Sequence, residues 1–384
     1  MAVAFDPLAQ DEPYAAYREL RESCPVYRNE ARGFWALSRF EDVQRAAREW
    51  TGFSSAEGVN LDDTLSLTGP GNFIAADPPD HDRLRRVVRG RFTPPGVAAM
   101  EAAIREDVRG VLAVAVREGG FDAADALAWA IPVRTVSRVL RLPMQDEHLL
   151  RGWLRAVINR EATSDRLPAS ARAAAGELRA YLSEHLAQRR AAPGDDLLSD
   201  VVAGQGRGEL DEAELPGLCI LLYVAGTETV ADFIGNALVA LAEHPDQRAL
   251  LAAQPDLGGA AVEELLRYES PVQYQVRTAT VATELHGQRI AAGDRVALLW
   301  GAANRDERRW ERPDELDITR AHKRNLAFGE GIHHCLGAPL ARLEGRVVLE
   351  EVLEAMPQYR LDGPVERIAT HNTRGVARLP VAID

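Results

Sequence analysis

The chain has 384 residues, of which 46% are hydrophobic and 27% charged, a composition typical of a soluble globular protein. Asp and Glu outnumber Lys and Arg by 58 to 45, and the net charge of −13 argues against a nucleic-acid or anionic-membrane binder. Lys323 is the sole lysine, so a lysine-containing phosphate loop is excluded and a Schiff base could form at one position only. Three cysteines cannot make a disulfide framework. Because no N-terminal signal pattern and no bilayer-length apolar run is found, we expect a cytoplasmic protein.

Most of the chain has the amphipathic spacing that is typical of helices. In chain order, helices are predicted at 12–23, 39–50, 96–118, 122–140, 170–190, 211–243, 257–269 and 336–355. Asp77-Pro78-Pro79 is typical of a further helix start, with Asp as the cap and Pro in the first turn.

Short strands are predicted where Val and Thr alternate within 276–300, with turns at His286-Gly287 and 292–294. Further strands are predicted at 34–38 and 370–383, and loops at 54–72, 190–210 and 302–325. We expect a mainly α protein with a minor β region, organised as one domain over 1–384. Its helix-rich core would cover about 77–270 and 336–356, and its β-rich part about 25–40, 276–325 and 360–384.

Cys335 lies between a glycine-rich segment and a predicted helix. The unpaired N–H groups at a helix start, and the positive end of its dipole, stabilise a thiolate over a thiol. Glycines allow the backbone to approach a flat ligand closely. These properties suit an axial metal ligand.

Three other interpretations of Cys335 remain open on chemistry alone. It could be a buried apolar residue, a zinc ligand together with His333 and His334, or a Cys/His nucleophile. Adjacent ligands give poor zinc geometry, and no C-x-x-C or H-x-x-x-H partner exists. Cys24 and Cys219 lack such a setting, so we expect both to be structural.

The segment 328–337 fits the pattern F-G-x-G-x-H-x-C-x-G, which resembles the haem-binding loop of the cytochromes P-450. This resemblance implies a triangular-prism fold with a long central helix over haem. It implies Cys335 as the axial ligand of the haem iron, and Phe328, Gly331 and Gly337 as haem-binding residues.

The middle of the longest predicted helix reads Ala225-Gly226-Thr227-Glu228-Thr229. A central Gly costs about 0.5–1 kcal/mol relative to Ala, and a Thr hydroxyl can bond to the carbonyl four residues earlier, so the backbone ladder is weakened here. A packing notch with a solvated Glu is the alternative. The segment resembles the family's A-G-x-[DE]-T, which implies that Glu228 and Thr229 are catalytic, as the acid and the alcohol that deliver protons.

Glu264 and Arg267 form an E-x-x-R pair on one helix face, a weak pattern that Glu106 and Arg109 also fit. Its order along the chain resembles the family's structural ion pair behind the haem. The family often adds an Arg from a P-x-R stretch; Glu315 stands there instead, so Arg312 or Arg320 is expected to substitute.

Residues 77–94 resemble the helix along one haem edge, although a solvated Arg-rich helix is the plain alternative. His81 and Arg85 share a helix face and, with Arg277 and His333, match the family's donors to the haem propionates. The arginines of this helix that do not meet haem could dock an acidic electron donor of the ferredoxin type: Arg83, Arg86, Arg89 and Arg91.

The resemblance implies a monooxygenase that uses haem b and O2, with electrons that come from NAD(P)H through separate redox proteins because no flavin, nicotinamide or iron–sulfur motif is present. Its substrate would be a mostly apolar small molecule. We expect a monomer that binds neither nucleic acid nor membrane. Family position gives these substrate contacts, within or after the loop at 54–75: Phe73, Ile74, Val224, Ala225, Val272, Gln275 and Val276.

Three other functions are compatible with some of these motifs. The same fold could catalyse oxidative coupling, desaturation or nitration. A haem-binding sensor without turnover would have no need for Glu228 and Thr229. The third alternative function is a cysteine hydrolase without haem.

Overall fold

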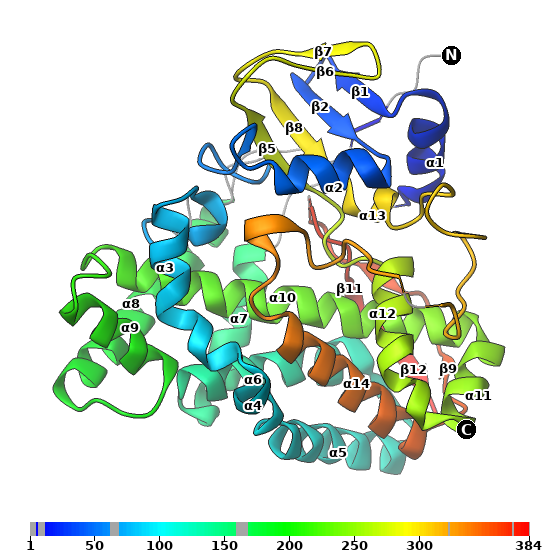
Figure 1. The fold of residues 1–384 in the computed structure, drawn as a ribbon. Helices are drawn as coiled ribbons and strands as arrows, with labels where there is room; N and C mark the ends of the chain where they lie inside the picture. Colours follow the sequence, from blue (N-terminus) through cyan, green and yellow to red (C-terminus); the bar gives the residue numbers. More distant parts are fainter. Residues whose placement is uncertain are drawn as a thin grey trace.

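A computed structural model describes residues 5–6, 12–61, 69–158, 168–321, 323–370 and 372–383. A small sheet with helix α2 beneath it lies on one side of a larger helical part (Figure 1). The described helices are α1 (Tyr14–Ser23), α2 (Phe40–Arg48), α3 (Asp80–Val88), α4 (Pro94–Ala98), α5 (Glu101–Glu118), α6 (Ala130–Leu140), α7 (Glu147–Ile158), α8 (Ala169–Ala191), α9 (Leu197–Gly206), α10 (Glu214–Glu243), α11 (Pro245–Ala253), α12 (Gly258–Tyr268), α13 (Trp300–Ala303) and α14 (Ala338–Ala355).

Both halves of the chain build the five-stranded sheet, whose order is β1-β2-β8-β5-β3. β2 runs parallel to β8, and the other strand pairs of this sheet are antiparallel. The strands are β1 (Val26–Asn29), β2 (Phe34–Leu37), β3 (Phe53–Ser54), β5 (Gln275–Ala279) and β8 (Arg295–Leu298). Between β5 and β8, the hairpin of β6 (Thr283–Leu285) and β7 (Gln288–Ile290) turns at His286-Gly287, as predicted.

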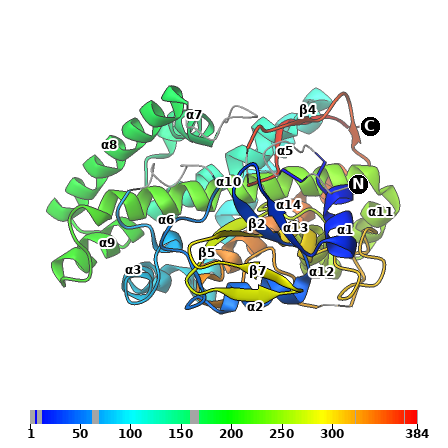
Figure 2. The same ribbon diagram turned by 90° about the horizontal axis from the view of Figure 1, so that it is seen from above.

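Helix α10 runs through the middle of the helical part, with α6, α8 and α14 packed around it (Figures 1 and 2). Among the described residues it is the one helix long and apolar enough to cross a membrane by length and composition, but 67% of that window is buried. Helix α10 is therefore a core helix of this fold. Gly226 does not interrupt it.

The remaining strands join segments that are distant in sequence. β4 (Gly120–Asp122) pairs with β12 (Pro380–Ala382), which also pairs with β9 (Arg360–Leu361). β10 (Glu366–Arg367) pairs with β11 (Val376–Arg378). Residues 372–376, which lead into β11, lie against α10, where Asn236 donates its Nδ2 to the Arg374 carbonyl at 2.7 Å.

The mainly α prediction with a minor β region is confirmed, and three details differ. The predicted loop at 190–210 contains α9, which Asp196 caps by accepting a hydrogen bond from the Ser199 amide at 2.9 Å. The predicted helix at 122–140 begins with a wider π-helical stretch, Ala124–Trp129, before α6. Helices α7, α11 and α13 and strand β4 lie where none was predicted. Residues 62–68 of the predicted 54–72 loop lie outside the described residues.

Candidate active site

The loop before α14 holds Cys335 in a fixed position. The Cys335 amide donates to the Phe328 carbonyl at 2.9 Å, and α14 begins three residues later. Gly331 has φ +72°, and a Cβ there would stand 2.6 Å from the Ala47 carbonyl oxygen, so the loop needs glycine at this position.

The environment of the Cys335 thiol acts in two directions. Burial raises the pKa of the Cys335 thiol, whereas the Gly337 and Ala338 amides and the positive charges of Arg85 and Arg342 lower it. The sequence predicted the lowering by the helix start. The thiol is open to the cavity, yet the loss of hydration among the atoms packed around it outweighs that lowering. A bound metal ion deprotonates a coordinating thiol outright, so the site suits a thiolate ligand once a metal is present.

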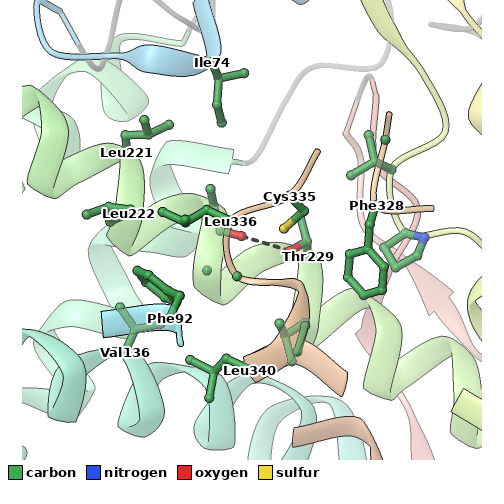
Figure 3. A pocket seen from close by; sticks show the side chains of 18 of the residues that line it. Ile74, Phe92, Val136, Leu221, Leu222, Thr229, Phe328, Cys335, Leu336 and Leu340 are labelled. Carbon is green, nitrogen blue, oxygen red and sulfur yellow. Dashed lines mark hydrogen bonds between the residues drawn. The ribbon is translucent and has the colours of Figure 1, made fainter. Parts of the chain in front are cut away.

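Cys335 faces an apolar cavity of about 1490 Å³, counted to its open mouth (Figure 3). Apolar side chains from the turn at Phe73–Ala75 through to α14 line it, among them Ile74, Phe92, Val136, Leu221, Leu222, Phe233, Leu266, Phe328, Leu336 and Leu340.

Thr229 reaches the same cavity from α10, as Figure 3 shows. Its hydroxyl donates to the Ala225 carbonyl at 2.9 Å, which confirms the predicted bond to the residue four positions earlier. Glu228 points elsewhere: it is not among the residues that line the cavity, and the Thr373 hydroxyl donates to its Oε1 at 3.1 Å. The alcohol therefore faces the cavity, and the carboxyl stands behind it.

A cluster of cationic and imidazole groups lies at one edge of the cavity. It consists of His81, Arg85, Arg277 and His333, brought together from α3, β5 and the loop before α14. The rings of His81 and His333 stand 4.7 Å apart between centroids. His81 Nε2 and both ring nitrogens of His333 are buried without a hydrogen-bond partner among the described residues.

Burial and mutual repulsion make it costly to hold positive charge on the side chains of this cluster. Burial, and then the charges of Arg277, His81 and Arg85, lowers the pKa of His333 to about 2. Burial also lowers the pKa of Arg277 to about 10, against the opposing effect of Asp77. A ligand that carries carboxylates would satisfy these donors and neutralise their charge.

The predicted substrate contacts divide into two groups. Phe73, Ile74, Ala225, Val272 and Gln275 line the cavity, whereas Val224 and Val276 do not. Val276 packs into a core cluster with Tyr274 and Ala297 because neighbouring residues of a strand point to opposite faces. Val224 packs against the apolar cluster that surrounds α8 and α9.

The buried pair Glu264–Arg267 on α12 has the third partner that the sequence left open. Arg267 donates to both Glu264 oxygens at 2.7 Å, and Arg320 Nε donates to Glu264 Oε1 at 3.0 Å. Arg320 therefore takes the place of the usual arginine, while Arg312 pairs with Glu315 at 2.6 Å.

Comparison with known proteins decides the family. Residues 257–366, which include Cys335, match the family described as cytochrome P450. The chain is 36% identical over 391 residues to a putative cytochrome P450 123 of Mycobacterium bovis, covering 99% of this chain and 97% of that protein. It is 36% identical over 385 residues to vitamin D(3) 25-hydroxylase of Pseudonocardia autotrophica, covering 97% and 94%. The crystal structure of CalO2 superposes with a TM-score of 0.90 at 34% identity, covering 100% of this chain and 99% of that one.

The chain belongs to the cytochrome P450 family. It is a haem-dependent monooxygenase with the cytochrome P450 fold, as the resemblance of its motifs implied. Haem and O2 follow from membership of the family, as do electrons from redox partners.

The residues present fit a haem group in this cytochrome P450. Gly337 lines the cavity, and a Cβ there would meet no atom of the described residues within 4 Å, so this space is available to a flat ligand. The two carboxylates of haem match the unpartnered donors of the cationic cluster. The zinc alternative has no support, since no group of three or more His, Cys, Asp or Glu side chains that could hold a metal comes together among the described residues.

Two buried carboxyls near the site escaped the sequence analysis. Glu344 of α14 lines the cavity, and Asp232 of α10 is buried one turn after Glu228. Glu344 interrupts a mostly apolar helix face, whereas Asp232 shares its face with Glu228 and Asn236. An acidic residue at a buried helical position is the pattern that could have identified both.

Proposed function

We propose that this cytochrome P450 hydroxylates a neutral, mostly apolar small molecule, with Cys335 as the axial ligand of haem b. The observation that carries the proposal is an apolar cavity that Cys335 and Thr229 both line, with the cluster of His81, Arg85, Arg277 and His333 at its edge. Haem bound through a thiolate supplies the activation of O2 and the insertion of one oxygen atom into a C–H bond.

Haem binding is assigned to the loop before α14 and to the cationic cluster. Cys335 would ligate the iron, Phe328 would pack on the ring, and Gly331 and Gly337 would keep the loop close to it. His81, Arg85, Arg277 and His333 would hold the two propionates. In support, Phe328, Cys335 and Gly337 line the cavity, and the buried nitrogens of His81 and His333 lack partners among the described residues.

Proton delivery is assigned to Thr229 and Glu228. The Thr229 hydroxyl would hold a proton at the cavity wall, and the Glu228 carboxyl would supply it from behind. The placement of the alcohol in the cavity and of the carboxyl against Thr373 supports this division of roles.

The substrate is assigned a neutral, apolar character by the cavity wall. Phe73, Ile74, Ala225 and Val272 offer hydrocarbon surface, and the Gln275 amide offers one hydrogen-bonding group. Of the ionisable side chains in the described wall, Arg85 is assigned to the propionates, and burial raises the pKa of Glu344 to about 8 and keeps it neutral. A charged molecule would therefore lose its hydration here without a free partner of opposite charge.

Electrons would come from NAD(P)H through a ferredoxin that docks beside α3. Three of the four predicted arginines already pair with acidic residues of this chain: Arg83 with Glu214 at 2.8 Å, Arg91 with Asp200 at 2.5 Å and Arg86, more loosely, with Glu209 at 3.8 Å. Arg86 and Arg89 are exposed and remain the better candidates.

We further propose a cytoplasmic monomer. Its residues 1–384 would form one domain, since strands from both halves of the chain share one sheet.

The test of the proposed function is the spectrum of the reduced, carbon monoxide-bound protein. We expect the red-shifted Soret band of a thiolate ligand, lost in Cys335→Ser and retained in Cys24→Ser and Cys219→Ser. A band typical of histidine ligation, or failure of the purified protein to bind haem, would overturn the proposal.

A further inference from the structure

Phe73 belongs to a short turn before α3, residues 73–75, and the surrounding chain fixes the backbone of this turn. Asn72 caps it: its side-chain oxygen accepts a hydrogen bond from the amide two residues later at 3.0 Å. At Gly71, where φ is +93°, a Cβ would collide with the Glu214 carbonyl oxygen at the start of α10. The Phe73 side chain is buried and lines the cavity. Its ring therefore has a defined place in the cavity wall.

The Phe73 ring contacts two members of the cationic cluster. Its centroid lies 6.3 Å from that of the His81 ring, with 79° between the two planes, which is an edge-to-face arrangement. The guanidinium carbon of Arg85 lies 5.8 Å from the centroid of the Phe73 ring, within the range of a cation–π interaction. Two of the four side chains assigned to the haem carboxylates thus pack on one aromatic ring.

Hydrogen bonds alone do not fix the orientation of these two side chains. Among the described residues, the Arg85 guanidinium makes one hydrogen bond, which Nη2 donates to the His334 carbonyl at 2.6 Å. The His81 ring also makes one, between Nδ1 and the exposed Asp82 carboxyl at 2.8 Å. Because a planar group can still rotate about a single hydrogen bond, packing against Phe73 contributes to the orientation of both.

The part of the wall that contains Phe73 is also the part assigned to the substrate. Phe73 lines the cavity together with Ile74, Ala225 and Thr229, of which Ile74 and Thr229 are labelled in Figure 3. A molecule that fills this space would restrict the Phe73 ring, because a side chain packed on both sides has fewer accessible rotamers. Ile74 is the next residue of the same turn, but its aliphatic side chain offers no ring to the cationic cluster.

We propose that Phe73 is a positioning residue that couples occupancy of the substrate side of the cavity to the haem carboxylates, by way of His81 and Arg85. This inference rests on the proposed function, since it requires haem in the cavity. The coupling is reciprocal. A molecule packed against Phe73 tightens haem binding, haem tightens the binding of that molecule, and removal of the ring lowers both effects by the same factor.

Resonance Raman spectra of the haem-loaded protein test this coupling with two probes, imidazole and 4-phenylimidazole. Both probes ligate haem iron through an imidazole nitrogen, and only the second adds a phenyl ring to the cavity. In the wild type we expect the propionate bending bands to differ between the two complexes. Phe73→Leu should make the bands coincide, whereas Phe73→Tyr keeps the ring and should retain the difference.

Ile74→Ala is the matched control for the loss of hydrocarbon surface from this turn. It should weaken the binding of 4-phenylimidazole but leave the difference between the propionate bands in place, because Ile74 does not pack its side chain as a ring on His81 or Arg85. Identical bands in the two wild-type complexes, or a difference that persists in Phe73→Leu, would overturn the proposal.

Transfer of haem to an apo-globin measures the same coupling as a rate. The wild-type complex with 4-phenylimidazole should lose haem roughly three- to tenfold more slowly than the complex with imidazole. In Phe73→Leu the two rates should approach each other. A ratio that stays at the wild-type value in Phe73→Leu would mean that the phenyl ring only obstructs the exit of haem, and the coupling would be rejected.

The reduced, carbon monoxide-bound spectrum separates this inference from the proposed function. Phe73→Leu should retain the thiolate-type Soret band; if that variant does not fold, Phe73→Met, which also lacks the ring, takes its place. A wild-type protein without the thiolate-type band would reject the proposed function and the coupling with it. A normal band together with unchanged Raman and transfer results in the variant would reject the coupling alone.

Discussion

Glu344 is a carboxyl group that one helix of the core holds away from water. Its Oε2 is buried without a hydrogen-bond partner among the described residues, and burial raises its pKa to about 8, against the Thr135 hydroxyl. The unfolded chain would lose this proton at an ordinary pH near 4.5. Folding therefore retains a proton that the unfolded state releases, and the free energy of unfolding should fall as pH rises between these values.

Glu344→Gln should remove that dependence. Because the amide stays neutral, the variant should gain stability relative to the wild type as pH rises from about 5 to 8, by up to about 3–5 kcal/mol on linkage grounds. Urea unfolding across this pH range measures the effect. The exposed Glu354→Gln on the same helix is the control, and parallel pH curves for wild type and Glu344→Gln would contradict the prediction.

The Thr229 side chain lines the cavity, and its hydroxyl is available for more than packing. Thr229→Ala should retain the carbon monoxide spectrum but divert a larger share of dioxygen to hydrogen peroxide, since proton delivery contributes on the order of 10²–10⁴-fold in rate. Peroxide formed per dioxygen consumed measures this. Thr229→Ser keeps the hydroxyl and should restore most of the wild-type ratio; equal ratios in all three proteins would remove Thr229 from the proton path.

At the scale of elements, two glycines of one loop should have separable roles. Gly331→Ala would force a side chain against the Ala47 carbonyl at φ +72°, so the folded loop should be destabilised with or without haem. Gly337→Ala would place its Cβ in the cavity, where no described protein atom lies within 4 Å.

The two variants are therefore expected to differ in which state they affect. Gly331→Ala should lower the melting temperature of the haem-free protein by several degrees, whereas Gly337→Ala should leave it unchanged and weaken haem retention. Melting curves of both forms, together with haem transfer to an apo-globin, measure the two effects. A haem-free Gly337→Ala protein as unstable as Gly331→Ala would show that the space is occupied by protein.

The elements that sequence predicts well are those whose cause is local. Helices such as α8 and α14 follow from periodicity, and Cys335 was identified because its whole pattern lies within ten residues. Helix α9 was missed because the turn residues around it outweighed its short apolar run, although Asp196 is an ordinary N-cap.

The parts that sequence cannot predict depend on contacts between distant segments. Family resemblance, not spacing, suggested that His81, Arg277 and His333 meet. Asp232 looks like one polar residue in an apolar helix until residues 372–376 are seen to pack against it. Val276 was assigned to the substrate site because position along the chain does not fix which face of a strand meets the cavity.

At the scale of the whole molecule, the net charge of −13 conceals local positive charge. If Arg86 and Arg89 contact the electron donor, replacing both by Ala should slow reduction by a surrogate ferredoxin about three- to tenfold at low salt and flatten its salt dependence. Stopped-flow reduction at several ionic strengths measures this, with the exposed Arg117→Ala as the control. Equal salt slopes in all three proteins would place the docking surface elsewhere.

The parallel pair β2–β8 also constrains how the chain is made. Residues 34–37 leave the ribosome about 260 residues before their partner at 295–298. At roughly 5–20 residues per second, the β1–β2 hairpin waits some 10–50 s with an unpaired edge. The sheet therefore closes after the helical part can have formed, and a chain with so many distant pairings should fold slowly. Overproduction yield should then depend more on translation rate and chaperone supply than on the stability of the finished protein.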